Sequence, residues 1–328
     1  MTRREFLQSL TVSFVLATPL VAHAQQAGKV YRIGYVSSAS PQPAQPGLSA
    51  FRQALRDLGW IEGQNVIIET RYTMGDNQQH AALIAEVLRL KVDVIVTTST
   101  PGALAAKAAT QETPIVFSMV SDPVATGVVT NLSRPGGNLT GWSNMLPVTT
   151  RKLLELLKEV SPTVSRVAVL FDPGNPGKLL EVKALQEDAG STGLALDPLE
   201  VRNLADITAA FASMAQKRTD GLVTLQDAVT GNHRKEIVEL AAKARIPAIY
   251  QTSEFVAAGG LMSYGMNMVA QYRRSAMYVD KIFRGAKPGN LPVEQPMMFE
   301  MVVNPRAAKA LGVTIPQSIL LRADRVIE

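Results

Sequence analysis

Short apolar segments rich in β-branched residues alternate with longer amphipathic segments along this sequence, and the alternation occurs twice. Strands that alternate with helices are typical of parallel sheets covered by helices on both faces. The predicted strands are 30–36, 65–72, 92–98 and 114–119 in the first series and 166–171, 195–201, 221–225 and 247–250 in the second. Each strand of the second series follows its counterpart by roughly 130 residues. The sequence therefore predicts an α/β protein with two similar, Rossmann-like lobes.

Segments with helical periodicity occupy the stretches between these strands. The predicted helices span 48–58, 80–90, 101–110, 178–188, 207–217 and 234–244. Glycine is common just after the last residue of a helix. Gly59 and Gly190 stand at such places, so we expect the first and the fourth of these helices to end there.

The residues after Tyr250 are too few to bury a third core, and a chain of 328 residues suggests about two domains. They comprise a predicted strand at 260–264, an amphipathic helix at 269–284 and an extended segment at 291–303. We expect these pieces to complete the two lobes by crossing between them. The predicted lobes are 28–142 plus 260–292 and 148–250 plus 303–328, with crossings near 141–150, 251–260 and 292–303.

Residues 1–24 have the layout of an export signal peptide. Arg3 and Arg4 precede an apolar segment at 9–22, and Ala22-His23-Ala24 fits a cleavage site. The arginine pair followed by Phe-Leu resembles a twin-arginine signal, but Gln8 replaces the usual lysine, so Sec export stays open. A membrane anchor is disfavoured because the apolar helix would span only about 21 Å of a hydrocarbon core about 30 Å thick. We expect cleavage near Ala24 and a periplasmic protein without a membrane span.

The residue inventory argues against catalysis and metal binding. The chain contains no cysteine, which excludes thiolate nucleophiles and cysteine-ligated metals. After the predicted cleavage site the only histidines are His80 and His233, whose polar neighbours predict surface positions. Phosphate-cradling glycine patterns, H-E-x-x-H and G-x-S-x-G are absent from the sequence. The net charge of +5 is spread without long basic runs. We therefore expect no enzyme activity, no cofactor, no metal and no nucleic-acid partner.

Small polar residues follow the carboxyl ends of six predicted strands. Ligands of doubly wound folds bind at this edge, where the loops of neighbouring strands converge. The same residue types also serve as helix N-caps, so each position alone has a structural alternative. The candidate ligand-binding residues are Ser37, Ser38, Thr98, Ser99, Thr100, Ser118 and Asp122 in the first half, and Asn175, Gln226, Asp227, Tyr250 and Tyr264 in the second.

The stretch Thr98–Thr100 is the most informative of these sites because it precedes a predicted helix opened by Pro101. Free amide groups and hydroxyls at a helix N-terminus suit an anion such as a carboxylate. Each dipole interaction contributes only about 0.3–1 kcal/mol, whereas micromolar affinity needs about 8 kcal/mol. Several groups must therefore act together in a site that closes. Tyr250 and Tyr264 are candidates for its apolar walls, with lobe packing as the alternative.

Five segments of the sequence match one known family: IGYVSS at 33–38, GWIEGQNV at 59–66, SDPVATG at 121–127, RPGGNLTG at 134–141 and YVDKI with GAKP within 278–288. They resemble the substrate-binding proteins of ABC transporters of the tryptophan/tyrosine-binding type. The resemblance implies a periplasmic-binding-protein class I fold, in which two lobes joined by three crossovers hold a ligand between them. It also implies that loops of both lobes at the candidate positions face the ligand. This chain has Gln226 and Met266 where many relatives carry proline.

These observations predict a periplasmic receptor that delivers a small molecule to an ABC importer. We expect the ligand to bear a carboxylate, with amino acids as one possible class, and to be enclosed as the lobes close. The expected partners are permease subunits in the inner membrane, and the receptor itself is expected to be a monomer. Two other classes stay open. One is a sensing module for a receptor kinase or chemoreceptor, and the other is an exported enzyme, which requires a nucleophile–base pair in the cleft.

Overall fold

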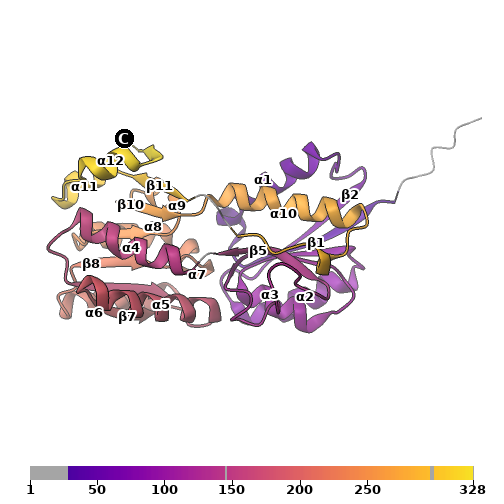
Figure 1. Ribbon diagram of the computed structural model, residues 1–328, viewed down its shortest axis with the longest axis horizontal. Helices are drawn as coiled ribbons and strands as arrows, with labels where there is room; N and C mark the ends of the chain where they lie inside the picture. Colours follow the sequence, from indigo (N-terminus) through magenta and orange to yellow (C-terminus); the bar gives the residue numbers. More distant parts are fainter. Residues whose placement is uncertain (1–28, 145, 296–298, 328) are drawn as a thin grey trace, which may run out of the picture.

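The computed structural model describes residues 29–144, 146–295 and 299–327. Two α/β lobes lie side by side along the long axis of the molecule (Figure 1). None of the described helices is long and apolar enough to cross a bilayer. The predicted export signal at residues 1–24 lies outside the described residues.

The first lobe is built on a parallel sheet. Its strands are β1 (Tyr31–Ser37), β2 (Val66–Tyr72), β3 (Val94–Thr98), β4 (Ile115–Ser121) and β5 (Leu139–Asn144). Its helices are α1 (Pro41–Asp57), α2 (His80–Arg89), α3 (Thr100–Ala109) and α10 (Met268–Phe283), with short 3-10 turns η1 (Asn77–Gln79) and η2 (Pro288–Asn290). The strand order is β2-β1-β3-β4-β5. Apolar side chains of α1 and α10 cover one face of this sheet, and those of α2 and α3 cover the other (Figure 1).

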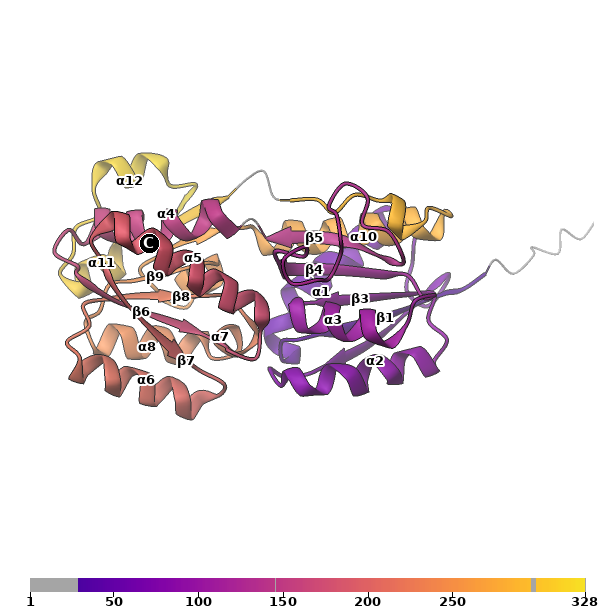
Figure 2. The same ribbon diagram turned by 60° about the horizontal axis from the view of Figure 1, so that its bottom comes forward.

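The second lobe repeats this plan and extends it. Its strands are β6 (Arg166–Phe171), β7 (Ala195–Glu200), β8 (Gly221–Thr224), β9 (Ala248–Tyr250), β10 (Met262–Gly265), β11 (Glu300–Val303) and β12 (Arg325–Val326). Its helices are α4 (Leu146–Val160), α5 (Pro176–Thr192), α6 (Leu204–Gln216), α7 (Ala228–Asn232), α8 (Arg234–Lys243), α9 (Ser253–Ala257), α11 (Pro305–Leu311) and α12 (Gln317–Arg322). Figure 2 shows α4 and α12 above the sheet and α6 and α8 below it.

The two sheets share one topology. The order β7-β6-β8-β9-β10 in the second lobe matches β2-β1-β3-β4-β5 in the first, and every pairing within these two sets is parallel. The second sheet continues into β11, which is antiparallel to β10, and then into β12. The predicted fold class, two α/β lobes with parallel sheets, is confirmed.

The strand predicted at 260–264 lies in the second lobe, and its assignment to the first lobe was wrong. This strand, β10, pairs with β9 on one side and β11 on the other. The short helix α9 returns the chain to the same sheet, where Leu261 and Met262 are buried in the core of the second lobe. The crossing predicted near 251–260 therefore occurs later, between Gly265 and the start of α10 at Met268.

Two helix boundaries also differ from the sequence-based expectation. α1 begins at Pro41, seven residues before the predicted start. Pro41 and Pro43 lie in the first turn, where proline removes only amides that have no partner inside a helix, and the helix also accommodates Pro46 in its interior. α5 continues through Gly190 and ends at Gly193, which adopts the left-handed conformation with φ 68°. An interior glycine costs a helix only about 1 kcal/mol, so Gly190 does not stop α5.

Candidate functional site

A cavity of about 150 Å3 lies between the two lobes. Residues at the carboxyl ends of β1, β3 and β5 line it from the first lobe, and residues that follow β8, β9 and β10 line it from the second. The first turns of α1, α5 and α10 complete the wall. The edges at which parallel strands end therefore meet at this cavity, as expected for ligand sites in doubly wound sheets.

The predicted site residues divide into two groups. Those that line the cavity are Ser38, Thr98, Ser99, Asn175, Gln226, Asp227 and Tyr264. Those outside its lining are Ser37, Thr100, Ser118, Asp122 and Tyr250. The cavity therefore brings together part of the predicted set from both lobes.

The residues outside the lining have structural partners. Thr100 Oγ1 accepts a hydrogen bond from the Ser121 amide, and Asp122 accepts one from the Ala125 amide within a turn. Tyr250 is buried in the second-lobe core and stacks on Phe255, with ring centroids 4.6 Å apart. Burial raises the pKa of the Tyr250 phenol, as expected for a core side chain. For this tyrosine the packing alternative holds.

Neutral hydroxyl groups form the first-lobe wall of the cavity. Ser38 Oγ lies 2.6 Å from Ser99 Oγ, 2.8 Å from the Thr98 carbonyl oxygen and 3.0 Å from His80 Nε2. His80 was expected at the surface, but it is only 1% exposed, and its Nδ1 lies 3.0 Å from the Asn77 carbonyl oxygen. Burial lowers the pKa of His80, so the ring is neutral at pH 7, with Nδ1 donating to that carbonyl oxygen. The hydroxyls are thus held in place from behind the cavity.

Ser38 and His80 are also the kind of pair that an exported enzyme requires. In serine hydrolases a carboxylate orients the histidine and stabilises its charged form. Here His80 Nε2 contacts Ser38, and its other ring nitrogen, Nδ1, contacts the Asn77 carbonyl oxygen instead of a carboxylate. Ser38 Oγ also has other protein partners. The arrangement positions a hydroxyl for hydrogen bonding and lacks the carboxylate that would make His80 an effective base.

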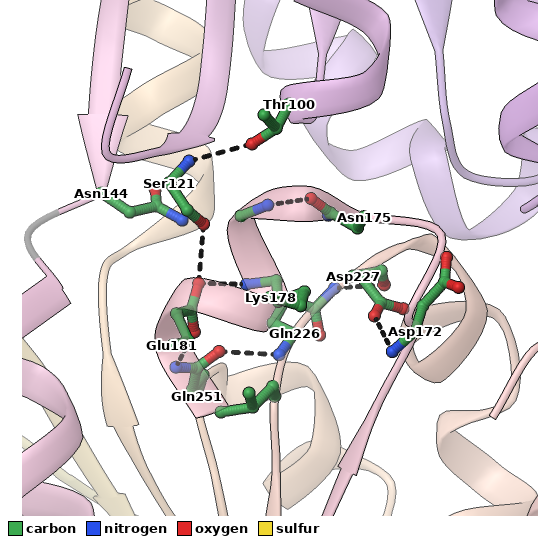
Figure 3. A network of polar contacts seen from close by, with 12 residues as sticks. Thr100, Ser121, Asn144, Asp172, Asn175, Lys178, Glu181, Gln226, Asp227 and Gln251 are labelled. Carbon is green, nitrogen blue, oxygen red and sulfur yellow. Dashed lines mark hydrogen bonds and ion pairs between the residues drawn. The ribbon is translucent and has the colours of Figure 1, made fainter. Parts of the chain in front are cut away.

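The second-lobe wall carries a buried ion pair that the sequence analysis did not identify. Asn175 caps α5 by accepting a hydrogen bond from the Gly177 amide, and the next turns present Lys178 and Glu181 on one face. Lys178 Nζ lies 2.6 Å from Glu181 Oε1, and the two side chains are 3% and 1% exposed. Glu181 Oε2 accepts a hydrogen bond from Gln251 Nε2 (Figure 3).

A second acidic centre lies beside this pair. Asp227 caps α7 by accepting a hydrogen bond from the Thr230 amide, and its other oxygen accepts one from the Asp172 amide. Burial and the neighbouring charge of Asp172 raise the pKa of Asp227 to about 6. Burial also raises the pKa of Asp172. Within residues 29–144, 146–295 and 299–327, no group of three acidic or histidine side chains is arranged to hold a metal ion.

Hydrogen bonds cross the boundary between the lobes around the cavity. They include Ser121 Oγ to Glu181 Oε1 (2.6 Å), the Ser40 amide to Asn232 Oδ1 (2.9 Å) and Asn77 Nδ2 to Asp172 Oδ2 (2.7 Å). Figure 3 shows Ser121 of the first lobe opposite Glu181 of the second. The lobes are therefore in direct contact, and the structure represents a closed conformation.

Gly177, at the start of α5, lies close to side chains of the opposite lobe. A Cβ atom at this position would lie 2.6 Å from Ser121 Cβ and 2.8 Å from Thr100 Oγ1. Such distances are shorter than van der Waals contact. Only glycine at this position therefore permits the first turn of α5 to meet the first lobe.

A family model described as ABC transporter substrate binding protein matches residues 39–327. The chain belongs to this family. Its members are binding proteins without enzyme activity, so the prediction that this chain is not an enzyme is confirmed. A tyrosine-binding protein of Clostridioides difficile (strain R20291) is 26% identical over 261 residues, which cover 80% of this chain and 75% of that protein. The predicted resemblance to tryptophan/tyrosine-type binding proteins is likewise confirmed.

Two solved structures are similar to this chain over about nine-tenths of its length. The ABC domain from Streptococcus pneumonia in complex with L-Trp has a TM-score of 0.84 at 24% identity and covers 90% of this chain and 99% of its own. A ligand-free, open substrate-binding protein from Clostridium difficile has a TM-score of 0.65 at 27% identity and covers 91% and 99%.

Proposed function

We propose that this chain is an extracytoplasmic receptor that encloses a small carboxylate-bearing solute, with amino acids as the leading class, and delivers it to an ABC importer. The observation that carries this proposal is the cavity into which both lobes project hydroxyl, amide and charged groups. The family to which the chain belongs supports the receptor function. The ligands named for two similar proteins, tyrosine and L-Trp, support the amino-acid class.

The polar end of the cavity is proposed to bind the backbone groups of such a solute. Ser38, Thr98 and Ser99 contribute from the first lobe, and Gln226 and Asp227 contribute from the second. Asn175 and Tyr264, which also line the cavity, are proposed as further contacts of the solute. A single neutral hydrogen bond contributes about 0.5–1.5 kcal/mol, so micromolar affinity requires contacts from both lobes at once.

An apolar section of the lining is suited to the side chain of the solute. Tyr264 and Phe255 from the second lobe and Met119, Met268 and Tyr272 from the first line the same cavity. Methionine and aromatic side chains adapt to flat apolar groups and bury large areas. An amino acid with an aromatic or large aliphatic side chain fits this division between polar and apolar surface.

Residues 1–24 are proposed to direct the protein to the periplasm, with twin-arginine export and cleavage near Ala24. Intact-mass measurement of the protein recovered from the periplasm tests the cleavage site. Replacement of Arg3 and Arg4 by lysine is expected to stop export through the twin-arginine route. Unchanged export of that variant would assign the signal to the Sec route.

The mature receptor is proposed to act as a monomer that docks on permease subunits of the inner membrane.

Isothermal titration calorimetry with the twenty amino acids and a set of small organic acids tests the binding proposal. Binding of one or a few amino acids at micromolar concentration, with one site per chain, is the expected result. A protein that binds none of these solutes at millimolar concentration would contradict the receptor function proposed here.

A further inference from the structure

We propose that Lys178 is the anion receptor of the cavity and that its ammonium group takes the carboxylate of the ligand. The carboxylate then lies against α5 of the second lobe, and not at the N-terminus of α3, which the sequence had suggested. This inference rests on the proposed receptor function and refines it to a residue and a place in the cavity.

The first argument is the unsatisfied hydrogen-bonding capacity of Lys178. Its side chain is 3% exposed and lines the cavity. An ammonium group has three N–H donors, and within the described residues the only side-chain acceptor recorded for Lys178 Nζ is Glu181 Oε1. A buried donor without an acceptor is costly. A ligand carboxylate in the cavity supplies acceptors for the remaining donors.

The second argument is that Glu181 is already satisfied on both oxygens. Oε1 accepts from Ser121 Oγ and Lys178 Nζ, and Oε2 accepts from Gln251 Nε2. Glu181 therefore anchors the ammonium group without exhausting its donors. Among the residues drawn in Figure 3, Glu181 is bonded to Ser121, Lys178 and Gln251, whereas Lys178 Nζ is bonded to Glu181 alone.

The third argument concerns the competing anion sites. In the first lobe, Ser99 Oγ caps α3 by accepting from the Gly102 amide and also contacts Ser38 Oγ, so these hydroxyls have protein partners. The other cation that lines the cavity, Arg234, donates to the Gly231 carbonyl oxygen and is partly exposed. Solvent weakens the attraction of an exposed cation for an anion, whereas a buried one keeps it.

A double-mutant cycle between protein and ligand tests this contact. The probes are L-tyrosine and L-tryptophan, each compared with its carboxamide, which lacks the negative charge. Calorimetry is carried out on the wild type, Lys178→Met, Lys178→Arg and the matched cation variant Arg234→Met. We expect Lys178→Met to weaken binding of the acids by about 100-fold and binding of the amides by less than about 5-fold. Lys178→Arg is expected to recover part of the loss, and Arg234→Met is expected to keep the wild-type preference for the acid over the amide.

Removal of Lys178 alone leaves Glu181 with one donor fewer, so a second variant keeps the test valid if Lys178→Met folds poorly. Lys178→Met combined with Glu181→Gln removes both charges of the pair together. This double variant is expected to fold and to bind acid and amide with similar, weak affinity. Retention of the wild-type preference for the acid by this variant would overturn the inference.

Other outcomes separate this inference from the receptor function. Equal affinity of the wild type for acid and amide, equal losses for both in Lys178→Met, or a large loss confined to Arg234→Met would each overturn the role of Lys178. The receptor function would stand in all three cases. A wild type that binds no solute of the broader panel would instead overturn the receptor function, and the inference with it.

Discussion

The two walls of the cavity come from lobes with the same strand order, but they carry different polar groups. The first-lobe wall presents neutral hydroxyls, exemplified by Ser38 and Ser99, that are held by neighbouring backbone and by His80. The second-lobe wall presents buried charges, Lys178 and Glu181, on the first turns of α5. Equivalent strand ends can therefore lead to different groups, because the loop after each strand and the first turns of the next helix supply the side chains that line the cavity. One wall offers fixed hydrogen bonds, and the other offers charge.

The largest expected effect comes from breaking the charged wall. Glu181→Ala leaves the Lys178 ammonium buried without its partner, which is expected to lower the free energy of unfolding by about 3–5 kcal/mol. The measurement is urea denaturation of the ligand-free protein. The comparison variant Ser38→Ala removes one neutral group from the other wall and is expected to cost about 1 kcal/mol. Similar losses of unfolding free energy in Glu181→Ala and Ser38→Ala would contradict the view that one wall is charged and the other neutral.

The second effect concerns contact between the walls. Gly177→Val places a side chain where Ser121 and Thr100 leave no room, so the lobes are expected to stay apart and ligand affinity to fall by about 100-fold. Gly190→Val is the matched control, because Gly190 lies in the same helix and has open space around its Cβ position. Calorimetry with the tightest-binding amino acid of the panel compares the two. Wild-type affinity in Gly177→Val would refute the requirement for this contact.

The third effect is a pH dependence of stability that arises at Asp227 in the second-lobe wall. Asp227 has a pKa of about 6 in the folded protein, compared with about 3.9 in an unfolded chain, so the folded state binds its proton more tightly. The contribution to stability is therefore fully present below pH 4 and is lost as the pH rises through 6. Its size is on the order of 2–3 kcal/mol.

Thermal or chemical unfolding between pH 4 and pH 7 measures this contribution. In the Asp227→Asn variant the fall in stability over this range is expected to be smaller than in the wild type. Some dependence remains there because burial also raises the pKa of Asp172. Parallel pH profiles for the wild type and the variant would contradict the assignment of this effect to Asp227.

The smallest effect concerns a hydrogen bond between the lobes that lies outside the cavity lining. Asn232 accepts a hydrogen bond from the Ser40 amide across the lobes and is outside the lining of the cavity. Asn232→Ala is expected to reduce affinity by about 3- to 10-fold, because one interlobe hydrogen bond is lost and the ligand contacts are not. The same titration measures this change. An unchanged affinity would indicate that this bond does not contribute to closure.

The sequence predicts the neutral wall better than the charged one. Residues such as Ser38 and Ser99 follow strands of the first lobe, and the convergence of loops at one sheet edge is a general property of parallel sheets. Lys178 and Glu181 form an i,i+3 pair on a helix, a pattern that is usually solvent-exposed. Glu181 is buried where it meets Ser121 of the opposite lobe, and no local pattern in the sequence records that contact.

The same limit applies to the fold. β-branched segments and helical periodicity predict the repeated α/β order, since both depend on neighbouring residues. The lobe to which β10 belongs depends on the length of α9 and on pairing with β11, which lies more than 30 residues away in sequence. His80 is buried for a comparable reason: its polar neighbours along the chain do not reveal that α2 turns it toward Ser38.

Closure of two chemically different walls around one solute is the central claim, and single-molecule energy transfer tests it most directly. The chain has no cysteine, so Glu112→Cys in the first lobe and Glu187→Cys in the second, both exposed positions, allow specific dye labelling. At saturating ligand, the wild-type background is expected to show one closed population and the Gly177→Val background a more open one. Identical distributions in the two backgrounds, with ligand bound to both, would contradict the account.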